Sequence, residues 1–143
     1  IGAPLLGKTL MQLSNRSIEA KKQEELKSLR LAPKLNSKNT QIDWDKSLDS
    51  IVNQIRGLNP YPGAWTTLVN NDKNLRIKIF NVVAQKTSHT YRKGQVIEKD
   101  SKLMIVTSEG YLICKELQLP NKKRMPVSAL LNGYSIGSNA RIH

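Results

Sequence analysis

The segment Ile55–Trp65, with the sequence IRGLNPYPGAW, separates a helical pattern from a series of β patterns in this chain of 143 residues. Pro62 and Gly63 suit the two central positions of a type II turn, because glycine readily adopts the positive φ that the second position requires. We therefore interpret the segment mainly as the corner between a helix and the first strand. The ring of Tyr61 within it also offers a surface for a nucleic-acid base, and such stacking contributes about 1–3 kcal/mol.

Apolar residues before this corner recur at the spacing of an amphipathic helix. They are Leu48, Ile51, Val52, Ile55 and Leu58. Asp45 or Ser47 suits the N-cap of this helix, and Gly57 suits its end. We expect Trp44 to pack the start of the helix against the β structure, with Asp43 accepting a hydrogen bond from a backbone amide.

After Ala64 the sequence predicts short β-strands with close turns. The expected strands are residues 65–69, 75–80, 95–98, 103–107 and 111–119, followed by a short helix at 127–131. In the second strand Leu75, Ile77 and Ile79 alternate with an expected outer set. That outer set is Arg76, Lys78 and Phe80. These patterns predict a mainly β fold, and for a basic chain we expect a small β-barrel of the oligonucleotide-binding type.

The chain opens with a helical pattern in which Leu6, Leu10 and Leu13 share one face and have no obvious partner. We expect residues 1–13 to be the last helix of a domain whose body lies outside this sequence. Residues 14–39 are rich in Lys, Glu, Gln, Ser and Asn, and they predict a linker. Residues 40–143 are the expected barrel domain.

Charge is the most informative part of the composition. Lys and Arg number 23 against 11 Asp and Glu, a net charge of +12, and residues 73–143 hold 13 of these basic and 4 of the acidic residues. Such an excess favours an anionic partner, with nucleic acid ahead of a membrane surface, although it is also compatible with solubility alone. No apolar run approaches the roughly 18 residues of a membrane helix, so we expect no membrane partner.

Residue types that carry chemistry are scarce. The single Cys114 has no second cysteine for a disulfide within the chain or for a metal site, which favours an intracellular, cytoplasmic protein. The apolar opening is short and no Lys/Arg-rich segment precedes it, which argues against a secretory signal. His89 and His143 are interpreted as surface residues without a chemical role. The sequence therefore predicts neither a catalytic centre nor a metal site.

Three stretches, in their order and spacing, resemble the C-terminal region of methionyl-tRNA formyltransferases. They are Ala32-Pro33-Lys34-Leu35 with Ile42-Asp43-Trp44, the segment Ile55–Trp65, and residues 117–125 (LQLPNKKRM) with Leu130-Leu131-Asn132-Gly133. The resemblance runs from about Leu5 to nearly the end of the chain and is weakest at residues 85–93 and after Gly133.

The resemblance implies a function. Members of that family transfer a formyl group from 10-formyltetrahydrofolate to the amino group of methionine on initiator tRNA. They combine a Rossmann-like catalytic domain, which holds an Asn, a His and an Asp, with a C-terminal barrel that helps to hold the tRNA. The implied partners of this chain are initiator methionyl-tRNA and the catalytic domain itself. The chain alone is then non-catalytic and binds no cofactor.

Lys122, Lys123 and Arg124 are the leading candidates for contact with tRNA phosphates, because three adjacent cations in a turn reach phosphates without being buried. Where the family pattern predicts glycine, this chain has Asn121, which tolerates a positive φ. Five more cations complete the candidate set. They are Arg56, Arg76, Lys78, Arg92 and Lys93.

Arg56 has an alternative role, because it is placed to cap the last carbonyls of its helix or to pair with Asp43 or Asp49. For the other four of these cations, phosphate contact and plain solubility remain equal alternatives.

Two other functions stay open on the sequence alone. One is the C-terminal domain of a related formyltransferase that acts on an amino-sugar nucleotide. The other is a free-standing nucleic-acid-binding or scaffold module. The basic C-terminal half and the motif at residues 117–125 favour the tRNA enzyme over both.

Overall fold

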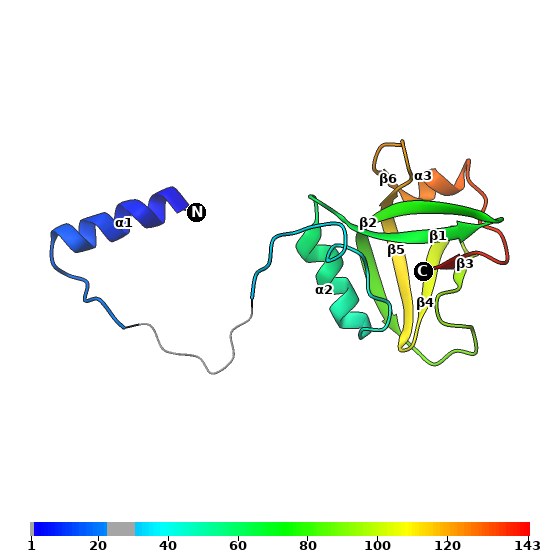
Figure 1. The fold of residues 1–143 in the computed structure, drawn as a ribbon, viewed down its shortest axis with the longest axis horizontal. Coiled ribbons are helices and arrows are strands. Elements are labelled where there is room, and N and C mark those ends of the chain that lie inside the picture. The colour runs from blue at the N-terminus through cyan, green and yellow to red at the C-terminus, as the bar shows by residue number, and fades with distance from the viewer. Residues whose placement is uncertain (1, 23–30) are drawn as a thin grey trace. The chain divides into compact units, whose positions relative to one another are not determined.

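The computed structural model describes residues 2–22 and 31–143, and it divides the chain into two compact units, Ile1–Pro33 and Lys34–His143 (Figure 1). The first unit contains helix α1 (Gly2–Ser14), which buries no residue. Its leucines at positions 5, 6, 10 and 13 are 56–62% exposed, as expected for an apolar face without a partner. Part of the predicted linker, residues 23–30, lies outside the described residues.

The second unit contains helix α2 (Leu48–Leu58), whose N-cap is Ser47. The Ser47 Oγ accepts a hydrogen bond from the backbone N–H of Ser50, as N-cap hydroxyls do. The expectation that Gly57 ends the helix is wrong, since the helix continues to Leu58. It ends there because Asn59 precedes a proline and takes an extended conformation, with φ −87° and ψ 134°.

The corner after α2 has the positive φ that was expected at its glycine. Gly63 has a φ of +82°, and its N–H donates to the carbonyl of Leu58 at 2.9 Å. The Asn59–Pro60 and Tyr61–Pro62 peptide bonds are both cis. A Cβ on residue 63 would meet the ring of Phe80 at 3.0 Å, so the absence of a side chain lets the corner approach the sheet closely.

Seven strands form one antiparallel sheet that curls into a nearly closed barrel. They are β1 (Ala64–Asn70), β2 (Lys73–Lys86), β3 (Val96–Lys99), β4 (Lys102–Thr107), β5 (Gly110–Gln118), β6 (Met125–Pro126) and β7 (Arg141–Ile142). Their order is β3-β4-β5-β2-β1-β7, with β6 paired to β5. Closure comes from an antiparallel bridge between Gln95 and Arg141 and from the hydrogen bond of the Ile142 N–H to Gly94 O at 2.8 Å.

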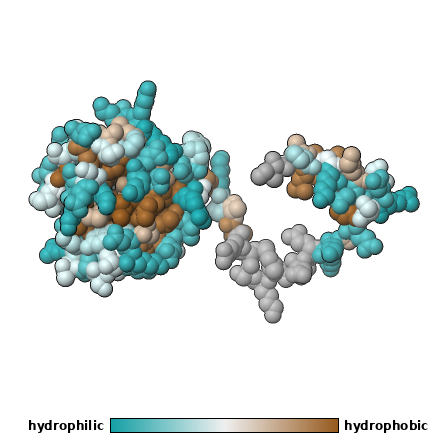
Figure 2. All heavy atoms as spheres, turned by 180° about the vertical axis from the view of Figure 1, so that it is seen from behind, coloured by the Kyte–Doolittle hydropathy of each residue, from teal (hydrophilic) through white to brown (hydrophobic). Residues whose placement is uncertain are grey.

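Helix α2 lies along one side of the barrel and the short helix α3 (Val127–Leu131) lies beside β6 (Figure 1). The fold class predicted from the sequence, a mainly β barrel preceded by an amphipathic helix, is thus confirmed. The expected strands and the helix at 127–131 are all present, while β6 and β7 were not predicted. Seen from behind, the barrel surface is largely hydrophilic around a central hydrophobic patch (Figure 2).

Strand β2 departs from the simple alternation expected of it. Its pairing with β5 shifts register between Ile79 and Asn81, which marks a bulge. Phe80 lies at this bulge and is only 6% exposed, but it is not part of the core cluster. The corner at Gly63 and the Arg124 guanidinium cover its ring on the side where Lys78 lies, which supports its predicted place on the outer face. Arg76 and Lys78 also lie on the outer face, as predicted.

The core is continuous from α2 through the inner faces of the strands. Trp44 is buried, and its Nε1 donates a hydrogen bond to Thr66 Oγ1 at 2.9 Å. Asp43 Oδ1 accepts a hydrogen bond from the backbone N–H of Asp45 at 3.0 Å. The predicted packing role of Trp44 and the predicted backbone contact of Asp43 are thus confirmed. Cys114 is buried as well, and burial raises the pKa of its thiol to about 12.

No helix in residues 2–22 or 31–143 is long and apolar enough to cross a membrane.

Candidate nucleic-acid interface

A row of polar and aromatic side chains crosses the outer face of three neighbouring strands. The pairing places Trp65 of β1 opposite Lys78 of β2, and Lys78 opposite Gln118 of β5. Arg76 lies two residues from Lys78 on the same face of β2. We call the set Trp65, Arg76, Lys78, Gln118 and the turn 121–123 the basic strip.

Arg76 is held in a defined position on the basic strip. Its guanidinium carbon lies 3.8 Å from the centre of the Trp65 ring, and its Nη2 donates to Ser37 Oγ at 2.9 Å. The Trp65 Nε1 donates to the carbonyl of Ser37 at 2.8 Å. Ser37 therefore orients both partners of this cation–π pair. It belongs to residues 34–39, which the sequence assigned to the linker but which lie in the compact second unit.

Lys78 connects the strip to the corner after α2. Its Nζ donates to the carbonyl of Pro62 at 2.8 Å, which leaves two of its three N–H donors for other acceptors. A hollow of about 360 Å³ opens beside it, and Tyr61 and Arg76 are among the residues that line it. Tyr61 is 85% exposed, the highest value for any aromatic side chain in the described residues.

The turn after β5 extends the strip. Asn121 has the positive φ expected there, +58°, and Gln118 Nε2 donates to the carbonyl of Lys122 at 2.7 Å. A smaller hollow of about 200 Å³ lies between this turn and the two cations of β2. Lys122 and Lys123 are exposed, and within residues 2–22 and 31–143 neither forms an ion pair. No described residue lining the two hollows of the strip is acidic.

Arg124, the third cation of the predicted cluster, turns away from its neighbours. It donates to Glu116 Oε2 at 2.5 Å and to Asn59 Oδ1 at 2.9 Å, and its guanidinium carbon lies 4.4 Å from the centre of the Phe80 ring. The hydrogen bond from Arg124 is the main reason that the pKa of Glu116 is lowered. Because this charge is already paired, Arg124 is a weaker candidate for phosphate contact than Lys122 and Lys123.

Arg56 forms none of the contacts expected for it within the fold. Its Nη2 donates to Asn53 Oδ1 at 3.0 Å, one turn earlier on α2. The two expected carboxylate partners pair elsewhere, Asp43 with Lys46 and Asp49 with Lys86. The Arg56 side chain is exposed and stays a candidate for phosphate contact away from the basic strip.

Arg92 and Lys93 are neighbours in the sequence, but their side chains make different contacts. Arg92 is exposed and lines a hollow of about 490 Å³ with Arg141, a basic residue that sequence reasoning missed because β7 has only two residues. Lys93 forms an ion pair with Asp45, and this contact lowers the pKa of the Asp45 carboxyl.

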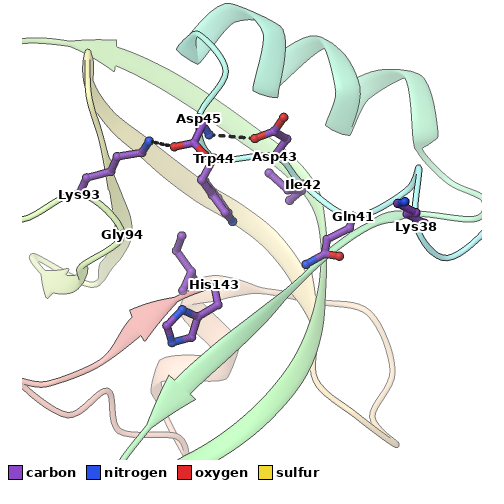
Figure 3. A pocket seen from close by; sticks show the side chains of 10 residues that line it. Lys38, Gln41, Ile42, Asp43, Trp44, Asp45, Lys93, Gly94 and His143 are labelled. Carbon is purple, nitrogen blue, oxygen red and sulfur yellow. Dashed lines mark hydrogen bonds and ion pairs between the residues drawn. The ribbon is translucent and has the colours of Figure 1, made fainter.

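Another hollow, of about 550 Å³, lies beside that ion pair (Figure 3). Its wall carries Asp43 and Asp45 together with Lys38 and Lys93, and the His143 side chain lies across from them (Figure 3). The two carboxylates offset the charges of the two lysines, so this hollow lacks the excess of positive charge that would attract phosphate. We therefore do not assign the RNA interface to this hollow.

The two histidines differ from each other. His143 is exposed, as predicted, but His89 is half-buried, so its interpretation as a plain surface residue is wrong. Its Nε2 lies 2.8 Å from the carbonyl oxygen of Thr107, and its ring packs 5.1 Å from that of Tyr111. Among the described residues no three His, Cys, Asp or Glu side chains gather at metal-binding distance.

Comparison with known proteins places the chain in a family. The family described as Formyl transferase, C-terminal domain matches residues 34–135. The methionyl-tRNA formyltransferase of Flavobacterium johnsoniae is 37% identical over 143 residues, and that of Parabacteroides distasonis is 34% identical over 140. These alignments cover 100% and 94% of this chain but 45% and 43% of the two relatives, so the chain spans less than half their length.

Among solved structures, the fold is similar to part of HypX from Aquifex aeolicus. A structure of HypX with tetrahydrofolic acid matches with a TM-score of 0.57 and 16% identity, over 89% of this chain and 22% of that one. A HypX variant gives a TM-score of 0.61 at 14% identity, over 90% and 23% of the two chains. At such low identity the likeness concerns the fold alone.

Proposed function

The chain belongs to the formyl transferase C-terminal domain family, and we propose that it is the tRNA-binding part of a methionyl-tRNA formyltransferase. The observation that carries the proposal is the basic strip. Arg76, Lys78, Lys122 and Lys123 follow one another along an outer face of the barrel with no carboxylate among the described residues of its hollows. Such a strip is suited to the phosphate backbone of an RNA.

In this proposal the chain contributes binding and positioning. The catalytic Asn, His and Asp, and the site for the donor 10-formyltetrahydrofolate, belong to the part of the enzyme outside this sequence. The barrel holds initiator methionyl-tRNA so that its methionyl amino group reaches that site. Phosphate contacts dominate the interaction, so the barrel adds affinity and leaves most of the discrimination between tRNAs to the catalytic part.

The alternative function, a domain from a formyltransferase acting on an amino-sugar nucleotide, gives no reason for a basic strip of this length. A small nucleotide occupies one or two cations, whereas the strip presents four, two on β2 and two in the turn after β5. The curated relatives quoted above are also methionyl-tRNA formyltransferases. Both observations support the tRNA enzyme.

The proposal is tested by titrating the chain with initiator methionine tRNA over a series of salt concentrations, with elongator methionine tRNA in parallel. We expect binding to both tRNAs that weakens steeply as salt rises. The double variant Lys122→Ala/Lys123→Ala should bind more weakly, with the slope of log affinity against log salt reduced by about 1.8, which is about 0.9 per lost contact with duplex phosphates.

The matched control removes the same charge at another place. Lys99 and Lys102 are exposed at the turn between β3 and β4, and β5 separates that hairpin from β2 in the sheet. The variant Lys99→Ala/Lys102→Ala should keep a slope close to that of the unaltered chain. Equal losses in the two double variants would show that net charge alone drives binding. No binding at low salt would overturn the proposed function.

A further inference from the structure

We propose that the hollow between Tyr61 and Arg76 is a subsite for one unpaired base of the bound RNA. The inference rests on the proposed function and adds to it a chemical ligand, a single-stranded nucleotide held by stacking. Two flat groups are among the residues that line the hollow, Tyr61 and the Arg76 guanidinium, which lies on Trp65. An RNA bound through its phosphates alone would need neither of these flat groups.

The Tyr61 ring is exposed although its backbone is held firmly. It is 85% exposed, so it contributes little to the core. The corner that carries it is tied on both sides, by the Gly63 N–H to Leu58 O and by Asn59 Nδ2 to Phe80 O at 3.1 Å. An aromatic ring on a fixed backbone stacks on a base with little loss of conformational entropy.

The second flat group that lines the hollow, the Arg76 guanidinium, is stacked on Trp65. Trp65 covers one face of the Arg76 guanidinium at 3.8 Å, and the hydrogen bond to Ser37 keeps the group in that plane. Arg76 is exposed, so its other face is open to a ligand. Guanidinium planes and aromatic rings are the two surfaces on which RNA-binding proteins stack single-stranded bases.

Size and charge match the same ligand. The volume of about 360 Å³ lies at the small end of the range for ligand pockets, roughly 300–1,000 Å³. Lys78 also lines the hollow, and since one of its N–H donors is used by Pro62 among the described residues, the others are available to the phosphate of a nucleotide bound there. From there the backbone has a cationic path along the strip to Lys122.

The test uses the whole chain and two short RNAs of the same length, a uridine hexamer and its abasic counterpart. The two share phosphates and differ only in bases. We expect the hexamer to bind at least about fivefold more tightly, the lower end of what one stacked base supplies. Tyr61→Ala should remove this preference, and Tyr61→Phe should keep it because stacking does not need the hydroxyl.

A control separates this ring from aromatic surface in general. Tyr91 is 49% exposed and lies away from the basic strip, so Tyr91→Ala should leave the preference unchanged. Equal affinity of the unaltered chain for the two hexamers, or an unchanged preference in Tyr61→Ala, would overturn the subsite. The proposed function survives either result if initiator tRNA still binds with steep salt dependence. It fails separately if tRNA does not bind at low salt.

Discussion

The guanidinium carbon of Arg124 lies 4.4 Å from the centre of the Phe80 ring, although the two residues belong to the turn after β5 and to the bulge of β2. The same guanidinium donates to Glu116 and to Asn59. One side chain thereby connects β5, β2 and the corner after α2. The charge of Arg124 is thus paired within the fold, unlike the charges of the two lysines that precede it.

Arg124→Ala should destabilise the barrel. It removes a cation–π contact, which contributes about 0.5–1 kcal/mol at an exposed site, and an ion pair worth about 0–1 kcal/mol. We expect the free energy of unfolding to fall by about 1–2 kcal/mol in urea titrations. The control Lys122→Ala should change it by less than about 0.5 kcal/mol, since that side chain is exposed. Equal effects of the two substitutions would contradict this structural role.

The contribution of Glu116 to stability should depend on pH. The hydrogen bond from Arg124 lowers the pKa of this carboxyl in the folded chain below its ordinary value of 4.5. Its stabilising effect is therefore complete above that ordinary value and is lost as the pH falls through the lower, folded-state pKa. We expect Glu116→Gln to be less stable than the unaltered chain at pH 7, with the gap closing below about pH 4.5. Urea titrations at pH 7 and pH 3 measure it, and a constant gap would contradict the pairing.

Two glycines should respond in opposite directions to alanine. Gly110 has a φ of +141°, and a Cβ there would lie 2.1 Å from the carbonyl oxygen of Gln85, so Gly110→Ala should cost more than about 2 kcal/mol. Gly57 lies inside α2 with nothing within 4 Å of the added Cβ, so Gly57→Ala should stabilise by about 0.5–1 kcal/mol. Thermal unfolding distinguishes the two, and a loss of stability in Gly57→Ala would contradict the helical assignment of this residue.

The elements that the sequence predicted well are those specified by their own residues. Helix α2 has a complete apolar period and a serine cap, and Asn121 accepts the positive φ that its turn requires. The bulge at Phe80 could not be predicted in this way, because the alternation in residues 75–79 is regular. The shift arises from the pairing of β2 with β5.

In the candidate site, too, some features were predictable from local sequence and others arise only from the fold. Arg76 and Lys78 were predicted on the outer face from alternation, and that prediction is confirmed. The role of Ser37 had no signal, because a serine in a polar segment is ordinary until Trp65 and Arg76 are brought to it by the fold. Strand β7 likewise exists only through its pairing with β1. The binding of RNA to Lys122 and Lys123 stays a prediction.

Arg76→Lys should separate charge from stacking at the proposed subsite. Lysine keeps the positive charge, so the salt dependence of tRNA binding should stay the same within error. Lysine lacks a planar group that could stack between Trp65 and a base. The preference for the uridine hexamer over its abasic counterpart should therefore fall severalfold. The matched control is Arg92→Lys, the same exchange at an exposed site beside Arg141. Unfolding curves of both variants check that the barrel is intact. An unchanged preference in Arg76→Lys would mean that the guanidinium does not stack on the base, whereas a reduced slope would show that Arg76 also contacts a phosphate that lysine does not reach.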